Sequence, residues 1–201
     1  MNDCFFFDFR ILPDVLIHAI RILQGLLLFK IILIFIPKNC SLLMHREKII
    51  HFLETIGIPV IERELPDDCF LPGLALERNT ILMDPQRMKY PGDLLHEAGH
   101  LAVTSPEFRE LVGTEAMDPA WPSDGDELAA ILWSYAALRH LQLEPEVVFH
   151  PNGYKDQSEW LIEQFRNQNY IGLPLLEWMG FCVAQERDGI SPFPHMIKWL
   201  R

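Results

Sequence analysis

The chain has 201 residues, 49% of them hydrophobic, and a formal net charge of −11. Its length is enough for one well-buried domain and too short for two ordinary ones. The acidic balance excludes nucleic acid as the main partner, because binding to phosphate requires clustered Lys and Arg. The four cysteines are scattered without a C-x-x-C pair, which favours free thiols in a reducing compartment over a disulfide framework.

The first 43 residues differ in character from the remainder of the chain. They carry four basic against three acidic groups, so the remaining segment carries −12. Residues 11–36 are strongly apolar and long enough to span a bilayer. Asp14, Arg21 and Lys30 interrupt this stretch, and a charge near the membrane centre costs roughly 2.5–3.5 kcal/mol. The segment has no small-residue cleavage site, so we do not expect it to be a signal peptide that is removed.

Three interpretations of this segment stay open: a membrane anchor, an amphipathic extra helix, or a stretch upstream of the true start. We favour the third, because residues 44–50 are typical of the beginning of a cytosolic protein. If residues 1–43 are instead an anchor, the more basic residues after the apolar stretch keep the rest of the chain inside the cell. We therefore predict an N-terminal extension of residues 1–43, a domain of residues 44–201, and a cytoplasmic location for that domain.

The domain begins with an amphipathic helix over residues 46–56, which Gly57 ends. Residues 58–61 predict a strand, and residues 75–78 with 80–83 predict a hairpin or bent strand. These β elements precede the segment that carries the most specific motif of the chain.

Residues 91–102 contain the pattern His96-Glu97-x-x-His100 within the apolar spacing of a helix. Residues four apart lie on one helical face, so both imidazoles can point at one ion, with Glu97 beside them. This arrangement supplies two zinc ligands and a general base. The alternative is a hydrogen-bonded His pair without metal, since unpaired buried polar groups cost about 1–3 kcal/mol each.

A short helix is expected after this motif, from Ser105 to about Val112, because a capping residue is followed by Pro106. The turn formers of residues 113–125 predict a loop. Residues 126–142 predict a helix that is apolar almost all round, as expected of an element buried against the metal helix.

Three further helical segments are predicted over residues 144–149, 158–167 and 174–184. Between the first two of them, His150 and Tyr154 lie in one turn. We interpret this as a surface turn with a half-exposed aromatic side chain.

The motif of residues 96–100 resembles the active-site helix of the zincin metallopeptidases. The metzincin branch is excluded, because it would need Gly and His where this chain has Val103 and Pro106. The gluzincin branch takes a Glu from a second helix, and Glu127 opens such a helix here. Between His100 and Glu127 lie 26 residues, and Glu127 is followed closely by the small Ala129 and Ala130. In both features the chain resembles the compact intracellular peptidases of the ImmA/IrrE type.

The resemblance implies a mainly helical zincin-like α+β domain, in which a small sheet precedes the active-site helix and its edge strand can hold an extended peptide. It implies one Zn²⁺ bound by His96, His100 and Glu127, with Glu97 as the catalytic base that activates water. The implied substrate is a peptide or protein. In several zincins a downstream His or Tyr bonds the oxyanion, which is the alternative role for the two turn residues named above.

Two alternatives bear on this interpretation. Glu127 and Asp126 open a helix, where acidic residues gain from the helix dipole even with no metal. The chain could also be a non-catalytic, zinc-binding regulatory protein that keeps the zincin-like fold. The presence of Glu97 favours catalysis, because a purely structural zinc site does not need it.

Overall fold

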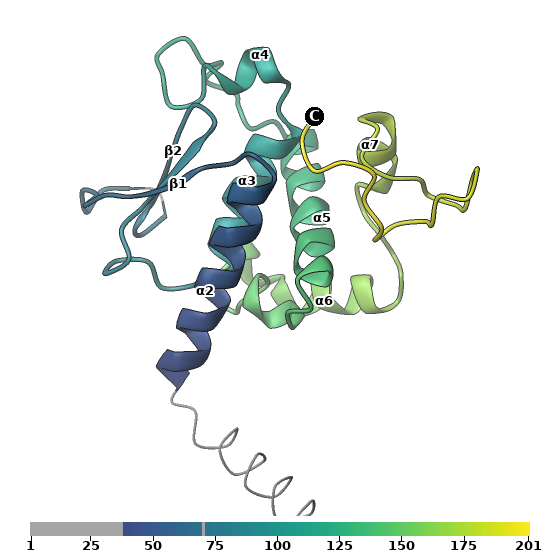
Figure 1. The fold of residues 1–201 in the computed structure, drawn as a ribbon, viewed down its shortest axis with the longest axis horizontal. Coiled ribbons are helices and arrows are strands. Elements are labelled where there is room, and N and C mark those ends of the chain that lie inside the picture. The colour runs from purple at the N-terminus through teal and green to yellow at the C-terminus, as the bar shows by residue number, and fades with distance from the viewer. Residues whose placement is uncertain (1–37, 70) are drawn as a thin grey trace, which may run out of the picture. The chain divides into compact units, whose positions relative to one another are not determined.

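The structure is a computed structural model that describes residues 38–69 and 71–201. It is mainly helical, with a small mixed sheet that precedes the central helices, which confirms the predicted α+β class (Figure 1). The helices are α2 (Lys38–Thr55), α3 (Asp93–Val103), α4 (Pro106–Arg109), α5 (Asp124–His140), α6 (Ser158–Arg166) and α7 (Leu173–Trp178), with 3-10 turns η2 (Pro145–Val147) and η3 (Tyr154–Asp156).

Most of the predicted N-terminal extension, residues 1–37, lies outside the described residues. The first described helix, α2, covers most of the helix predicted over residues 46–56 and begins earlier, at Lys38. None of the helices described over residues 38–69 and 71–201 is long and apolar enough to cross a membrane.

Three short strands form the sheet: β1 (Val60–Glu62), β2 (Leu74–Glu77) and β3 (Thr80–Met83). The central strand is β3, which runs parallel to β1 and antiparallel to β2, so β2 lies at an edge of this sheet. Glu77 pairs with Thr80 across a two-residue turn, which confirms the predicted hairpin. The strand predicted over residues 58–61 is found slightly later in the chain, as β1.

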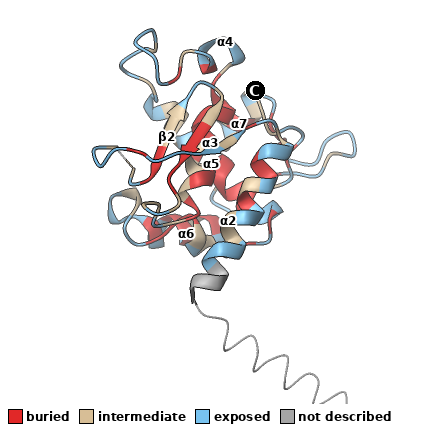
Figure 2. Ribbon diagram, turned by 60° about the vertical axis from the view of Figure 1, so that its left-hand side comes forward, coloured by how far each residue is buried: buried red, intermediate tan, exposed pale blue. Residues whose placement is uncertain are grey.

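Helices α3 and α5 lie side by side, with α3 between the sheet and α5 (Figure 1). The Ser134 hydroxyl on α5 donates a hydrogen bond to the Leu95 carbonyl on α3, and Gly99 faces Ala130 one turn further on. Residue numbers rise along one helix as they fall along the other, so the two helices are antiparallel. Both helices are buried along most of their length (Figure 2). This burial explains why α5 is apolar almost all round.

The second of these helices begins at Asp124 rather than at residue 126. Ser123 is its N-cap, because the Ser123 hydroxyl accepts a hydrogen bond from the Asp126 N–H and the Asp126 carboxylate accepts one from the Ser123 N–H. This reciprocal capping stabilises the first turn even though Gly125 lies within it. The prediction of a loop over residues 113–125 is therefore wrong at its C-terminal end.

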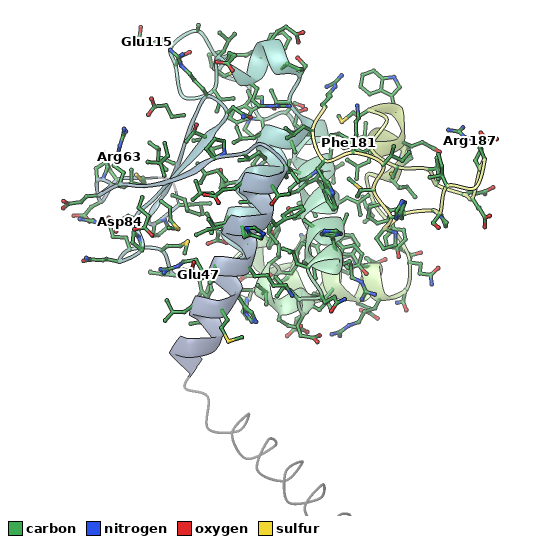
Figure 3. The ribbon with its side chains drawn as sticks, viewed as in Figure 1. Glu47, Arg63, Asp84, Glu115, Phe181 and Arg187 are labelled. Carbon is green, nitrogen blue, oxygen red and sulfur yellow. The ribbon has the colours of Figure 1, made fainter. Side chains whose placement is uncertain are left out.

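The helix predicted over residues 174–184 is too long, because α7 ends at Trp178. Gly180 has a φ of 78°, and the Phe181 N–H donates to the Leu176 carbonyl, an arrangement that ends helices. The chain then continues without regular structure. Phe181 is buried close to α7, whereas Arg187 lies on an exposed loop that projects away from that helix (Figure 3).

The contact between α3 and α5 gives a first prediction: Gly99→Ala should destabilise the protein, although Ala is the better helix former. A Cβ atom at residue 99 would lie 2.8 Å from the Ala130 carbonyl oxygen, so the two helices would have to separate. We expect a loss of about 1–3 kcal/mol in the free energy of unfolding, measured by chemical denaturation.

Gly125→Ala is the matched control, because a Cβ atom at residue 125 meets nothing closer than 3.7 Å. This substitution should leave the free energy of unfolding unchanged or raise it. Equal effects of the two substitutions would contradict the close packing of the helices.

Candidate metal centre

His96 and His100 lie one turn apart on α3 and present their Nε2 atoms to each other at 3.1 Å. The other faces of the helix are occupied by buried apolar residues, which fixes the direction of both imidazoles. These residues are Leu94, Leu95, Ala98, Leu101 and Ala102. The structure therefore confirms that residues four apart place both His side chains on one face of a buried helix.

Glu127 reaches the two imidazoles from the first turn of α5. Its Oε2 atom lies 3.3 Å from His100 Nε2, and its Oε1 atom lies 3.7 Å from His96 Nε2. The neighbouring Asp126 is engaged in capping, since its carboxylate accepts hydrogen bonds from the N–H and hydroxyl of Ser123. Of the two acidic residues considered from the sequence, Glu127 is thus the one that joins the His pair.

These three side chains form a group that could hold a metal ion, because their ligand atoms all lie within 4.8 Å of one another. In a tetrahedral zinc site with bonds of about 2.0–2.1 Å, neighbouring ligand atoms are separated by roughly 3.3–3.4 Å. The two Nε2 atoms lie 3.1 Å apart, close to that value, and the two oxygens of Glu127 lie 3.3 Å (Oε2 to His100) and 3.7 Å (Oε1 to His96) from the imidazole nitrogens. Two imidazoles and one carboxylate are also a donor set that zinc prefers.

Burial keeps both imidazoles in the form that binds metal. It lowers the pKa of His96 to about 3, with a further contribution from His100, and it lowers the pKa of His100 to about 4. Both rings are therefore neutral at physiological pH, as metal ligation requires. The Nδ1 atoms of both rings are buried and have no hydrogen-bond partner within the described residues.

Glu97 lies beside this group and is half-buried. Burial raises the pKa of its carboxyl to about 8, and the nearby carboxylates of Asp93 and Glu127 add to this shift. A carboxyl group with so high a pKa can exchange a proton near neutral pH, which is the property of a general acid or base.

The metal-binding group and Glu97 line one pocket of about 810 Å³. One part of its wall comes from β2, another from the loop between α4 and α5, and a third from residues 150–155. Glu115 marks the loop between α4 and α5 in Figure 3. The size of the pocket is that of a small-molecule or peptide site rather than of a packing defect.

His150 and Tyr154 both line this pocket. Tyr154 is half-buried, as the interpretation of a surface turn with a half-exposed aromatic expects, but that interpretation is wrong for His150, which is buried. His150 is only 7% exposed, and its ring stacks on Tyr90 with 3.7 Å between ring centroids. His150 Nε2 lies 2.8 Å from Asp93 Oδ1. The Tyr154 ring packs edge-to-face on His96, with 5.5 Å between centroids.

Asp93 was not singled out from the sequence, although it holds His150 at the pocket. The signal was present, because Asp93 precedes Glu97 by four residues and must share its helical face. Burial raises the pKa of Tyr154 well above its ordinary value, and the carboxylates of Asp93, Glu127 and Glu97 add to the shift. The phenol of Tyr154 therefore keeps its proton and lies close to the metal-binding group.

No family model, curated protein or solved structure matches this chain. The likeness to zincin peptidases accordingly depends on the motif of residues 96–100 and on the placement of Glu127. The metal-binding group itself is a feature of the folded chain and does not depend on any relative.

The raised pKa of Glu97 predicts that Glu97→Gln stabilises the metal-stripped protein at alkaline pH. The folded-state pKa of about 8 exceeds the ordinary value of 4.5, so between these pH values the folded state holds a proton that the unfolded state has released. Stability is therefore lost as the pH rises through this range, and the Gln variant escapes that loss.

We expect the free energy of unfolding of Glu97→Gln, relative to the parent, to increase by more than ~1 kcal/mol between about pH 5 and about pH 9. Urea denaturation in the presence of a chelator measures this difference. A difference that does not change with pH would show that the Glu97 carboxyl is not shifted.

Glu127→Ala should weaken zinc binding strongly, whereas Asp126→Ala should weaken it little. The first substitution removes a donor of the metal-binding group. The second removes a carboxylate that caps α5, and the loss of this cap should lower the stability of the protein by about 0.5–2 kcal/mol. Competition with a zinc-binding dye measures the affinity, and thermal unfolding without metal measures the stability. If both variants lost zinc equally, Glu127 would not be the third ligand, and Asp124 or Asp126 would be the next residue to test.

Proposed function

We propose that this chain is a zinc-dependent peptidase of the zincin type, with a gluzincin-like ligand set of His96, His100 and Glu127. The observation that supports the proposal best is that this group and Glu97 line the same pocket. Structural zinc sites usually have four protein ligands, whereas three protein ligands with an open position are typical of catalytic sites. One zinc ion per chain is the expected stoichiometry.

When bound by these residues, zinc supplies a Lewis acid that lowers the pKa of water and polarises a carbonyl group. The Glu97 carboxylate accepts a proton from the attacking water and later delivers it to the leaving amine. Beside a cation, the Glu97 carboxyl ionises more readily than its pKa of about 8 in the metal-free chain indicates. Glu97 is thus the catalytic base and then the acid.

Two features support a peptide as the substrate. Residues Leu74 to Leu76 of the edge strand β2 line the pocket, so an extended peptide in the pocket can run beside this strand and contact its side chains. The Tyr154 hydroxyl keeps its proton near the metal-binding group, so it can donate a hydrogen bond to the oxyanion that forms when water attacks a peptide carbonyl.

The cysteines support the proposed cytoplasmic location. Cys69 and Cys182 are both free thiols, and Cys182 is buried. Free cysteines persist in reducing compartments, where disulfides are rare.

Glu97→Gln tests the function most simply, because it keeps the shape of the side chain and removes the base. Zinc content should stay at one ion per chain, while hydrolysis of an unstructured protein such as casein should fall by at least about 10²-fold. Elemental analysis and a fluorescent-casein assay measure the two quantities.

Two results would overturn the proposal in different ways. Full activity in the Gln variant would show that Glu97 is not the base. Zinc binding by the parent protein without any hydrolysis would instead support the non-catalytic, zinc-binding regulatory protein.

A further inference from the structure

The pocket around the metal-binding group has an apolar wall that the proposed chemistry does not use. Its residues come from β2, from the turn that precedes it and from the loop between α4 and α5. They are Leu71, Leu74, Leu76, Val112, Trp121 and Pro122. The segment of residues 150–155 contributes polar lining instead, including His150, Asn152 and Lys155.

The apolar wall directly adjoins the metal-binding group. The indole of Trp121 packs edge-to-face on His100, with 6.0 Å between ring centroids. Its Nε1–H donates to Thr104 Oγ1 at 3.0 Å, and the Thr104 hydroxyl in turn donates to the His100 carbonyl at 2.7 Å. Trp121 is thereby held at one orientation beside a proposed zinc ligand.

The strand and the loop that supply the wall are joined to each other. The Arg78 N–H, just after β2, donates to the Val112 carbonyl at 2.8 Å. Gly113 approaches the strand so closely that a Cβ atom there would lie 2.4 Å from the Leu76 carbonyl oxygen. The wall is therefore formed before any ligand binds, and a ligand does not have to order it.

Burial differs along the wall in a way that leaves apolar surface for a ligand. Leu74 and Val112 are 3% and 1% exposed, so they form its buried base. Leu71, Leu76 and Trp121 are only half-buried, and they line the pocket. Apolar surface of this kind gains free energy when an apolar group covers it.

We propose that this wall is a specificity subsite that binds a large aliphatic or aromatic side chain of a peptide substrate, next to the bond that is cleaved. The inference rests on the proposed peptidase function and names its substrate class. Acidic side chains are disfavoured, because a carboxylate covered by this apolar wall loses its hydration without gaining a hydrogen-bond partner there.

The experiment uses four peptides that are identical except for one residue beside the cleaved bond, which is Leu, Trp, Gly or Asp. The cleaved bond is first located by mass spectrometry of casein digested by the parent protein. If the parent protein does not cleave casein, the varied residue is placed at the centre of an unstructured peptide instead. Binding is then measured by calorimetry on full-length, zinc-loaded Glu97→Gln, so that the readout does not depend on hydrolysis. The Leu peptide should bind at least about tenfold more tightly than the Gly peptide, and the Asp peptide most weakly.

Leu76→Asp in the same background should abolish the preference for Leu over Gly. Ile61→Asp is the matched control, because Ile61 is 48% exposed on β1, at the other edge of the same sheet, and does not line the pocket. Trp121→Ala is a second variant, which enlarges the subsite and should shift the preference from Leu towards Trp.

Equal binding of the Leu and Gly peptides would overturn the subsite. If the parent protein nevertheless cleaved peptides, the proposed function would stand without it. A preference for Leu that both Leu76→Asp and Trp121→Ala left unchanged would place the apolar contact elsewhere and would also overturn the inference. If the parent cleaved nothing while the binding preference followed the variants as expected, the proposed function would fail and the apolar subsite would remain.

Discussion

The close approach of α3 and α5 at Gly99 and Ala130 is the constraint on which the site depends. Glu127 lies on α5, and the two imidazoles lie on α3, so the three ligand atoms meet only if the helices are antiparallel and nearly in contact. A residue with a Cβ atom at position 99 would separate the helices, because the Ala130 carbonyl occupies that space. The small residues at this contact therefore matter for the geometry of the site as well as for packing.

The same burial that stabilises the helix pair sets the electrostatics of the site. Both His side chains are deprived of solvent, which keeps them neutral and ready to bind a cation. Glu97 experiences the same environment with the opposite result, since desolvation favours its protonated form. The burial of these polar side chains lowers the stability of the metal-free chain, and a cation bound to the three ligands would offset part of this loss. Folding and metal binding are thus expected to be linked in this protein.

The parts of this structure that depend on local periodicity could be predicted from the sequence, and those that depend on contacts between distant segments could not. The hairpin, the helix with His96 and His100, and the apolar helix with Glu127 each follow from the spacing of residues within one element. The contact of His150 with Asp93 joins residues 57 positions apart, and no spacing rule indicates it. The apolar wall likewise brings together β2 and a loop that follows α4. The end of α7 was missed because apolar residues continue past Trp178, where Gly180 and the Phe181 N–H end the helix.

X-ray absorption at the zinc edge tests most directly whether two imidazoles and one carboxylate of this chain bind a single zinc ion, as proposed. We expect nitrogen and oxygen ligands at about 2.0–2.1 Å from the zinc, with the multiple scattering of two imidazole rings. We expect no sulfur ligand, although Cys69 also lines the pocket. A zinc–sulfur distance of about 2.3 Å, or a spectrum with no imidazole scattering, would contradict the ligand set and the peptidase mechanism that depends on it.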